Sequence, residues 1–183
     1  MCSADHEVGR VLGFGNGIRL LDDNQQAEPS RSRGDIIRAL ETFPAEFKRV
    51  VLDPADREAL MRPAFDGGWG IVEIIPHLKD WEEIYLTRVR NVLTEDRPAL
   101  PSYDDTLWSI ERDYRSQDPY EAFDAFSKMR AETVALLRDA ASADWDRTGI
   151  HGYYGEITLH WLADHMADHD AEHLQQSQEA LTV

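Results

Sequence analysis

Four long segments of the chain carry apolar residues at the spacing of an amphipathic helix. They cover about residues 32–52, 69–93, 119–141 and 156–181. The third segment has a clear start, because Asp118 stands at the N-cap position and a proline follows it. Four such helices with modest connections predict an all-α protein built as a four-helix bundle.

Weaker signals lie within and between these segments. Pro44 and Pro76 fall inside the first two predicted helices, where a proline removes one backbone hydrogen bond and favours a kink. Short helical turns are predicted over residues 55–61 and within residues 104–114. Strand-like alternation is faint and limited to residues 150–154, so the sequence does not predict a sheet.

The first 31 residues differ in composition from the rest of the chain. They contain the polar and Gly-rich pieces GFGNG and DDNQQ, which are typical of loosely packed tails. Residues 1–31 are therefore predicted to form a flexible N-terminal extension. Residues 32–183 are predicted to form one bundle domain, as expected for a chain of 183 residues.

The charge of the chain limits its partners. The formal net charge is −16, whereas nucleic-acid binding depends on clustered Lys and Arg, so no DNA or RNA partner is expected. No segment approaches the roughly 18 apolar residues of a membrane span, and the N-terminus has no apolar secretion segment. We expect a cytoplasmic protein that acts on a small-molecule substrate, away from membranes.

The cysteine count restricts the possible metal chemistry. Cys2 is the single cysteine, which rules out a disulfide within the chain and fits a reducing compartment. A zinc site built from cysteines is excluded for the same reason. If the chain binds a metal, histidine and carboxylate side chains must hold it.

The last predicted helix carries a stripe of histidines in LADHMADHDAEHLQQ, residues 162–176. His165, His169 and His173 are four residues apart, so they lie on one face of the helix. Two histidines at this spacing can give a metal two nitrogens. The stripe is about 12 Å long, so one ion can use only an adjacent pair, and His169 belongs to either pair. A solvated polar face is the alternative.

A third ligand would have to come from elsewhere in the chain. His77 lies in the apolar centre of the second predicted helix, where an imidazole without a partner is unfavourable. His160 lies on the opposite side of its helix, His151 precedes that helix and His6 falls in the extension. His77 is therefore the leading candidate, and a core histidine hydrogen-bonded to another side chain remains the alternative.

Two stretches together resemble the DinB/YfiT-like family of metal-binding four-helix bundles. GGWGIVEIIPHLKDWEEIYLTRV is similar to the second-helix segment of the family, and HMADHDAEHLQQ is similar to its last-helix signature. The resemblance covers about residues 33–181. It implies a metal, Zn²⁺ or Ni²⁺ most often, held by His77, His169 and His173. His165 would then stand beside the site as part of the cavity wall.

The resemblance also implies a range of functions. Several members are transferases that use a low-molecular-weight thiol, and some look like metal-dependent hydrolases. We therefore expect a divalent-metal-binding protein that acts on a small molecule by one of these routes. The alternative is a non-enzymatic, stress-associated bundle whose metal is structural. Structural zinc normally has four protein ligands, so a fourth ligand from Asp80 or His165 would favour that alternative.

Further expectations concern the surroundings of the metal. Asp80, Glu172 and His165 are candidates for a general base or for orienting the ligands, and Trp81 is a candidate for the pocket wall. Pro76 directly precedes His77, where the family generally has an ordinary helical residue, so it could re-aim that ligand. Because family members often pair through their helices, a homodimer is also expected.

Overall fold

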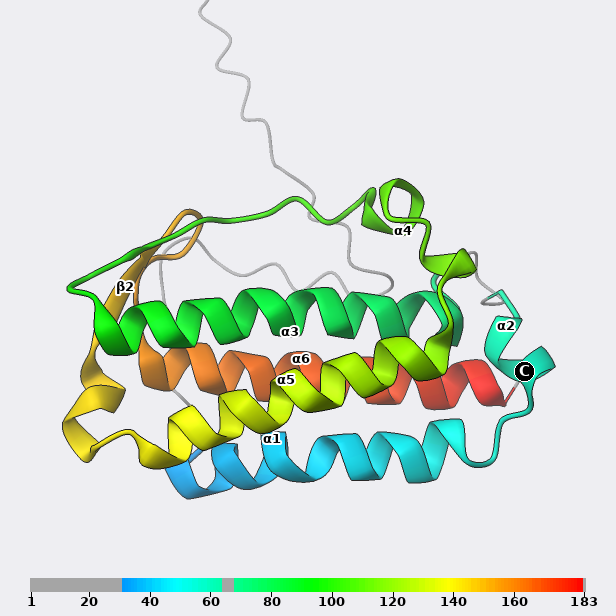
Figure 1. Ribbon diagram of the computed structural model, residues 1–183, viewed down its shortest axis with the longest axis horizontal. Helices are drawn as coiled ribbons and strands as arrows, with labels where there is room; N and C mark the ends of the chain where they lie inside the picture. Colours follow the sequence, from blue (N-terminus) through cyan, green and yellow to red (C-terminus); the bar gives the residue numbers. More distant parts are fainter. Residues whose placement is uncertain (1–30, 64–67, 183) are drawn as a thin grey trace, which may run out of the picture.

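The computed structural model describes residues 31–63 and 68–182, which fold into a four-helix bundle (Figure 1). This confirms the predicted architecture. The predicted extension over residues 1–31 lies outside the described residues except for Arg31, which pairs with Asp164 and Asp168 at 2.6 Å each. The long helices are α1 (Arg33–Phe47), α3 (Ile71–Thr94), α5 (Pro119–Asp139) and α6 (Leu159–Leu181).

The directions of the helices decide which residues can meet. The colours of Figure 1 show that α1 and α6 run one way and that α3 and α5 run the other way. Helices α3 and α6 are therefore antiparallel. The beginning of α3 lies against the second half of α6, and this pairing brings distant parts of the sequence together.

Short elements connect the long helices. The π-helix η1 and helix α2 follow α1, while α4 and the 3₁₀-helix η2 precede α5. Helices α2 and α4 correspond to the two short helical turns predicted from the sequence. A fifth short helical element, η3, follows α5. Their bounds are η1 Lys48–Leu52, α2 Arg57–Met61, α4 Trp108–Glu111, η2 Tyr114–Ser116 and η3 Ser142–Asp146.

A small sheet, which the sequence did not predict, closes one end of the bundle. Strand β1 (Ala99–Leu100) pairs in parallel with β2 (Thr148–His151), and β2 pairs in antiparallel with β3 (Gly155–Thr158). The last helix was predicted to begin near residue 156, and this start is wrong. Residues 155–158 are instead used in the ladder with β2, and Thr158 then caps α6 by accepting the Trp161 amide.

Neither internal proline ends its helix. Helical backbone continues through Pro44 in α1 and passes directly into η1. It also continues through Pro76, the sixth residue of α3. The start of α3 is fixed by Gly70, whose amide donates to Glu73 Oε2 at 3.0 Å. A Cβ at Gly70 would lie 2.3 Å from the Arg62 carbonyl oxygen, so only glycine fits this turn.

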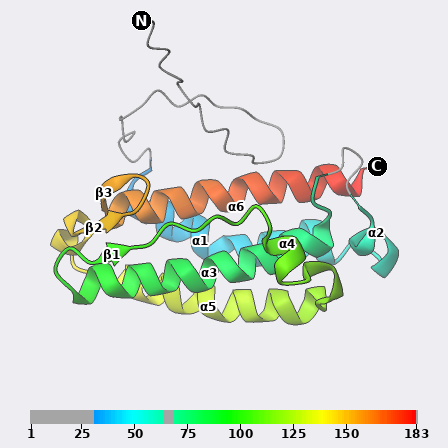
Figure 2. The same ribbon diagram turned by 90° about the horizontal axis from the view of Figure 1, so that it is seen from above.

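The strap, residues 95–107, returns the chain from the end of α3 to α4. Seen from above, it runs along α3 on the side of α6 (Figure 2). Trp81 donates to Asp105 and Arg88 donates to the Pro101 carbonyl, so two side chains of α3 hold the strap down. The strap therefore covers the face of α3 that carries Trp81 and Arg88.

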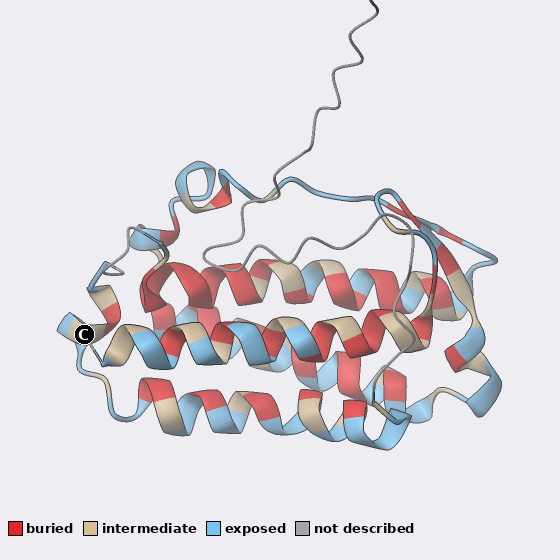
Figure 3. Cartoon of the chain, turned by 180° about the vertical axis from the view of Figure 1, so that it is seen from behind, coloured by how far each residue is buried: buried red, intermediate tan, exposed pale blue. Residues whose placement is uncertain are grey.

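Burial follows the bundle interior, and α3 is the most enclosed helix, as its wide apolar arc predicts (Figure 3). Two apolar clusters fill the interior, one near the sheet and one near the start of α3. Among the described residues, no helix is both long enough and apolar enough to cross a membrane.

Candidate metal centre

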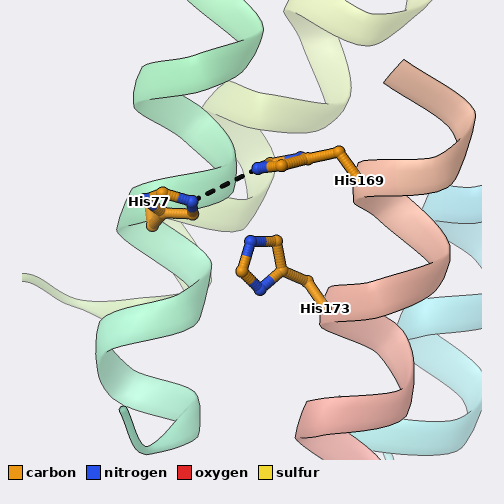
Figure 4. A group of neighbouring side chains, drawn as sticks. All are labelled: His77, His169 and His173. Carbon is orange, nitrogen blue, oxygen red and sulfur yellow. Dashed lines mark hydrogen bonds between the residues drawn. The ribbon is translucent and has the colours of Figure 1, made fainter. Parts of the chain in front are cut away.

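Three histidines from α3 and α6 converge inside the bundle (Figure 4). His77 comes from α3, and His169 and His173 come from successive turns of α6. One ring nitrogen from each lies within 4.8 Å of the other two, and His77 Nε2 is 3.2 Å from His169 Nε2. The antiparallel packing of α3 on α6 thus unites the residues that the family resemblance singled out.

The separation of the nitrogens suits a metal ion. Two nitrogens bound to zinc at 2.0–2.1 Å in a tetrahedral arrangement are about 3.3 Å apart. The His77–His169 distance of 3.2 Å is close to that value. His173 Nδ1 lies 3.0 Å from Gln176 Oε1, which leaves the Nε2 of His173 to face the other two rings (Figure 4). The donor set therefore fits a divalent ion that prefers nitrogen ligands.

Burial keeps the three rings neutral. It is the main cause that lowers the pKa of His77 and of His169 well below the ordinary value, and neighbouring histidines lower both further. Burial also lowers the pKa of His173 to about 4, although its bond to Gln176 opposes this shift. Neutral imidazoles present the lone pairs that a metal requires, so the cluster is ready to bind at neutral pH.

A carboxylate that sequence reasoning missed stands behind His77. Asp105 Oδ2 lies 3.9 Å from His77 Nδ1, which is buried and lacks a hydrogen-bond partner within the described chain. The same oxygen accepts the Trp81 indole N–H at 2.9 Å. The distance from Asp105 to His77 is too long for a hydrogen bond, but the negative charge favours the tautomer whose Nδ1 proton faces Asp105. No local sequence pattern could have found Asp105, since it lies 28 positions after His77, in a loop.

The other predicted neighbours lie at different distances from the cluster. Trp81 contacts it, with ring-centroid distances of 6.3 Å to His77 and 6.0 Å to His169. Asp80 points elsewhere, since it accepts from Arg112 at 2.7 Å and from Tyr114 at 2.9 Å. Glu172 is exposed and is not one of the converging residues of the described chain.

The remaining described histidines have other surroundings. His165 stacks on Trp161 with centroids 4.9 Å apart, so it lies one turn before the cluster and outside it. His160 hydrogen-bonds the Arg31 carbonyl, in line with its predicted position away from His169. His151, at the end of β2, stacks with Tyr154. Within the described chain, three histidines therefore converge and a fourth protein ligand does not.

Aromatic rings enclose the cluster on the α3 side. The Trp69 ring lies 4.6 Å from His77, and the Tyr85 ring lies 5.9 Å from His169. Trp81 of α3 contacts Tyr85 at 5.5 Å, whereas Trp69 precedes the helix. This wall lowers the local polarity, which favours the neutral form of the imidazoles.

A second buried polar cluster, also missed by sequence reasoning, lies beside the histidines. Arg130 of α5 donates to Glu82 of α3 at 2.9 and 2.7 Å and to both carboxylate oxygens of Asp170, the residue that follows His169. Thr133 donates to the other Glu82 oxygen at 2.5 Å. Each charged member interrupts an apolar stripe at four-residue spacing, a signal visible in the sequence: Leu78–Glu82–Leu86, Phe126–Arg130–Val134 and Met166–Asp170–Leu174.

The sequence of the chain matches the model of a known protein family. The family model described as the DinB superfamily matches residues 39–177. The chain belongs to the DinB superfamily. The match includes His77, His169 and His173, so the three converging histidines all lie in the part of the chain that carries the family pattern.

Relatives within the DinB superfamily bear names that refer to metals. YfiT of Bacillus subtilis (strain 168) is 31% identical over 121 residues, which are 66% of this chain and 67% of YfiT. Its solved structure is titled a probable metal-dependent hydrolase with an unusual four-helix bundle topology. That structure matches with a TM-score of 0.76 at 26% identity and covers 87% of this chain and 91% of its own.

A second relative gives the same indication. A protein of Oceanobacillus iheyensis, named as a candidate metal-dependent hydrolase, is 29% identical over 139 residues. The alignment covers 75% of this chain and 79% of the relative. These relatives are named for dependence on a metal, and in this chain three histidines that could hold one converge.

Proposed function

We propose that this DinB-superfamily protein is a metal-dependent hydrolase of a small molecule. The ion, Zn²⁺ or Ni²⁺, would be held by one nitrogen each from His77, His169 and His173. The observation that carries the proposal is the convergence of three neutral imidazoles, with ligand atoms within 4.8 Å of one another and no fourth protein ligand among the described residues. The names of the relatives support the choice of hydrolysis.

The number of ligands separates an active site from a structural one. Structural zinc sites are normally closed by four protein ligands, whereas catalytic sites keep a position for water or substrate. The two residues that could have closed the site are engaged elsewhere: Asp80 with Arg112 and Tyr114, and His165 with Trp161. An open ion bound here would act as a Lewis acid that lowers the pKa of water.

The residues of the chain would orient this chemistry. Asp105, whose carboxylate is 3.9 Å from His77 Nδ1, would move closer to accept the proton there, and Gln176 would accept the Nδ1 proton of His173 at 3.0 Å. Both contacts select the tautomer that leaves Nε2 free for the ion. Trp69, Trp81 and Tyr85 would exclude bulk water from one side of the site and offer an apolar surface to the substrate.

The test combines metal analysis with a substrate screen. Protein prepared without a His tag is expected to contain one divalent ion per chain and to hydrolyse members of a panel of small esters and amides. A chelator should abolish the activity and Zn²⁺ or Ni²⁺ should restore it. His169→Ala should lose both metal and activity. His160→Gln, on the same helix but outside the cluster, should keep both.

The same screen decides the reaction type. An open site could instead bind a thiolate, so each substrate is assayed with and without a low-molecular-weight thiol. Turnover that needs no thiol supports hydrolysis. Turnover that requires the thiol would replace the proposal with thiol-dependent transfer. Metal-loaded protein that is stabilised but inactive towards every substrate, with or without thiol, would favour a structural ion.

A further inference from the structure

Arg88 of α3 is a buried guanidinium without an acidic partner in the described chain. It is 5% exposed, and its one hydrogen bond within the described chain runs from Nη2 to the Pro101 carbonyl at 2.6 Å. Its Nε is buried without any acceptor. Arg130, equally buried on α5, has two carboxylates. A buried charge whose donors are unused is costly, so Arg88 calls for an explanation beyond packing.

Aromatic rings stabilise the charge of Arg88 without satisfying its donors. Its guanidinium carbon lies 5.6 Å from the Trp81 ring, 5.9 Å from the Tyr85 ring and 6.0 Å from the Tyr103 ring. Cation–π contacts of this kind offset part of the lost hydration. The rings provide no acceptor in the plane of the guanidinium, so its N–H groups can still donate to an acceptor on a ligand.

A groove with a volume of about 300 Å³ lies beside Arg88, between α3 and the strap. Arg88, Tyr103 and Pro101 line it, together with Arg112 and the acidic side chains of Asp80 and Glu83. Asp80 is already neutralised by Arg112 and by the Tyr114 hydroxyl. Glu83 is exposed and five residues before Arg88 on α3. Of the two guanidinium groups in the groove, Arg88 is the one that has no carboxylate.

The histidine cluster lies on the other side of the same aromatic wall. The Trp81 ring that contacts Arg88 is 6.0 Å from the His169 ring, and the Tyr85 ring is 5.9 Å from it. One layer of aromatic side chains therefore separates the guanidinium from the histidines. The histidines do not line the groove itself, so a molecule bound at Arg88 would reach them by extending past the edge of this layer.

We propose that Arg88 binds the carboxylate of the small-molecule substrate whose other end lies at His77, His169 and His173. The role of the far end rests on the proposed hydrolase function, while binding of a carboxylate by Arg88 does not. A monocarboxylate fits better than a phosphate, because Arg88 supplies one positive charge and a planar fork that matches a planar acceptor. Arg88 attracts one negative charge, and the acidic side chains of the groove repel a second one. The site should therefore prefer a singly charged anion.

The test measures binding to metal-free protein by calorimetry. The probe is 3-phenylpropionate, and its neutral isostere 3-phenylpropanamide serves as the comparison. The acid is expected to bind at least tenfold more tightly than the amide. Arg88→Met should remove this preference, and Arg88→Lys should retain part of it because the charge remains. Arg90→Met, an exposed position on the same helix paired with Glu132, should leave binding unchanged.

Three results would overturn the assignment. In the first, the acid binds no better than the amide. In the second, Arg88→Met binds the acid as tightly as the unsubstituted protein does, while its urea unfolding midpoint shows that it is folded. Either result would mean that Arg88 serves only to fasten the strap. Tighter binding of 3-phenylpropyl phosphate would also reject a carboxylate site. Carboxylate binding without any hydrolase activity would support the Arg88 assignment and count against the proposed reaction alone.

The orientation of the probe is measured separately, on Co²⁺-loaded protein, from the paramagnetic relaxation of the probe's protons. The account predicts faster relaxation of the ring protons than of the methylene protons beside the carboxylate, because the carboxylate would lie at Arg88 and the ring nearer the histidines. The reverse order would mean that the carboxylate itself binds the metal, which would contradict the proposal.

Discussion

Two buried polar clusters join α3 to α6, and they differ in how far the chain satisfies its own hydrogen-bonding groups. In the first, Arg130 donates to Glu82 and Asp170, and Thr133 completes the set. In the second, three imidazoles point their nitrogens at one another, and His77 Nδ1 has no hydrogen-bond partner among the described residues. Both clusters bridge the same pair of helices at neighbouring levels.

The difference separates a structural network from a ligand site. A buried network that is complete within the chain fixes how helices pack and has no capacity left for a ligand. Three neutral imidazoles that share a single short contact, His77 Nε2 to His169 Nε2, keep lone pairs that a positively charged ion can use. The Arg130 cluster therefore holds α3 and α6 in register, and that register brings the three histidines together.

The largest expected effect comes from breaking the complete cluster. Arg130→Met would leave Glu82 and Asp170 buried without their cation, which should lower the free energy of unfolding by about 3 to 5 kcal/mol. Urea denaturation of the metal-free protein measures this loss. Replacing all three charged residues by apolar ones of similar size should cost far less. If Arg130→Met alone is nearly neutral, the cluster does not hold the two helices together.

The pH dependence of stability probes the incomplete cluster. The folded pKa of His173 is lowered to about 4, whereas the unfolded chain has an ordinary pKa of 6.5. Between these two pKa values, the unfolded state binds a proton and the folded state does not. The contribution of His173 to the free energy of unfolding is therefore fully present above pH 6.5 and falls as the pH drops. The loss from this residue should approach about 3 kcal/mol near pH 4.

The measurement compares urea unfolding of metal-free parent and His173→Gln at pH 7 and at pH 4. The variant should lose less stability than the parent, because glutamine takes up no proton in this range. Equal losses in the two proteins would show that the His173 pKa is not lowered by folding.

A smaller effect should come from the carboxylate behind His77. Asp105→Asn removes the charge that orients the imidazole, so metal affinity should fall by about 10- to 100-fold. Competition with a chromogenic chelator measures the affinity. Asp96→Asn is the matched control, since Asp96 is an exposed residue of the same strap. A loss of the same size in both variants would indicate a general charge effect in place of a specific contact.

The smallest effect is expected at the histidine one turn before the cluster. His165→Ala removes stacking on Trp161 and should cost about 0.5 to 1.5 kcal/mol of stability. Metal affinity should change by less than about threefold, because His165 lies outside the converging group. A loss of metal affinity as large as that of Asp105→Asn would show that His165 contributes to metal binding, contrary to its position outside the converging group.

The bundle was predictable because its information is local. Helical periodicity, the Asp118–Pro119 start and the histidine spacing each lie within a few residues of one another. Choosing His169 with His173 over His165 was different, since spacing left both pairs open and the family resemblance made the choice. The structure brings that second pair to His77.

What the sequence did not show depends on contacts between distant segments. Strands β1 and β2 are short and pair across about 50 residues, so alternation gave almost no signal. Asp105 reaches His77 only because the strap folds back along α3. The Arg130 cluster was visible as charges on apolar stripes, but its partners lie on three different helices. Pro76 raised an expectation of a re-aimed His77, yet α3 continues through it and His77 joins the cluster.

X-ray absorption at the zinc edge measures whether three histidines hold the metal in an open site. The sample is chain purified without a His tag and reconstituted with one equivalent of Zn²⁺. The account predicts three imidazole nitrogens at about 2.0–2.1 Å and one further light-atom ligand that exogenous azide or thiol can displace. Four protein ligands that resist displacement, or a spectrum without three imidazoles, would contradict it.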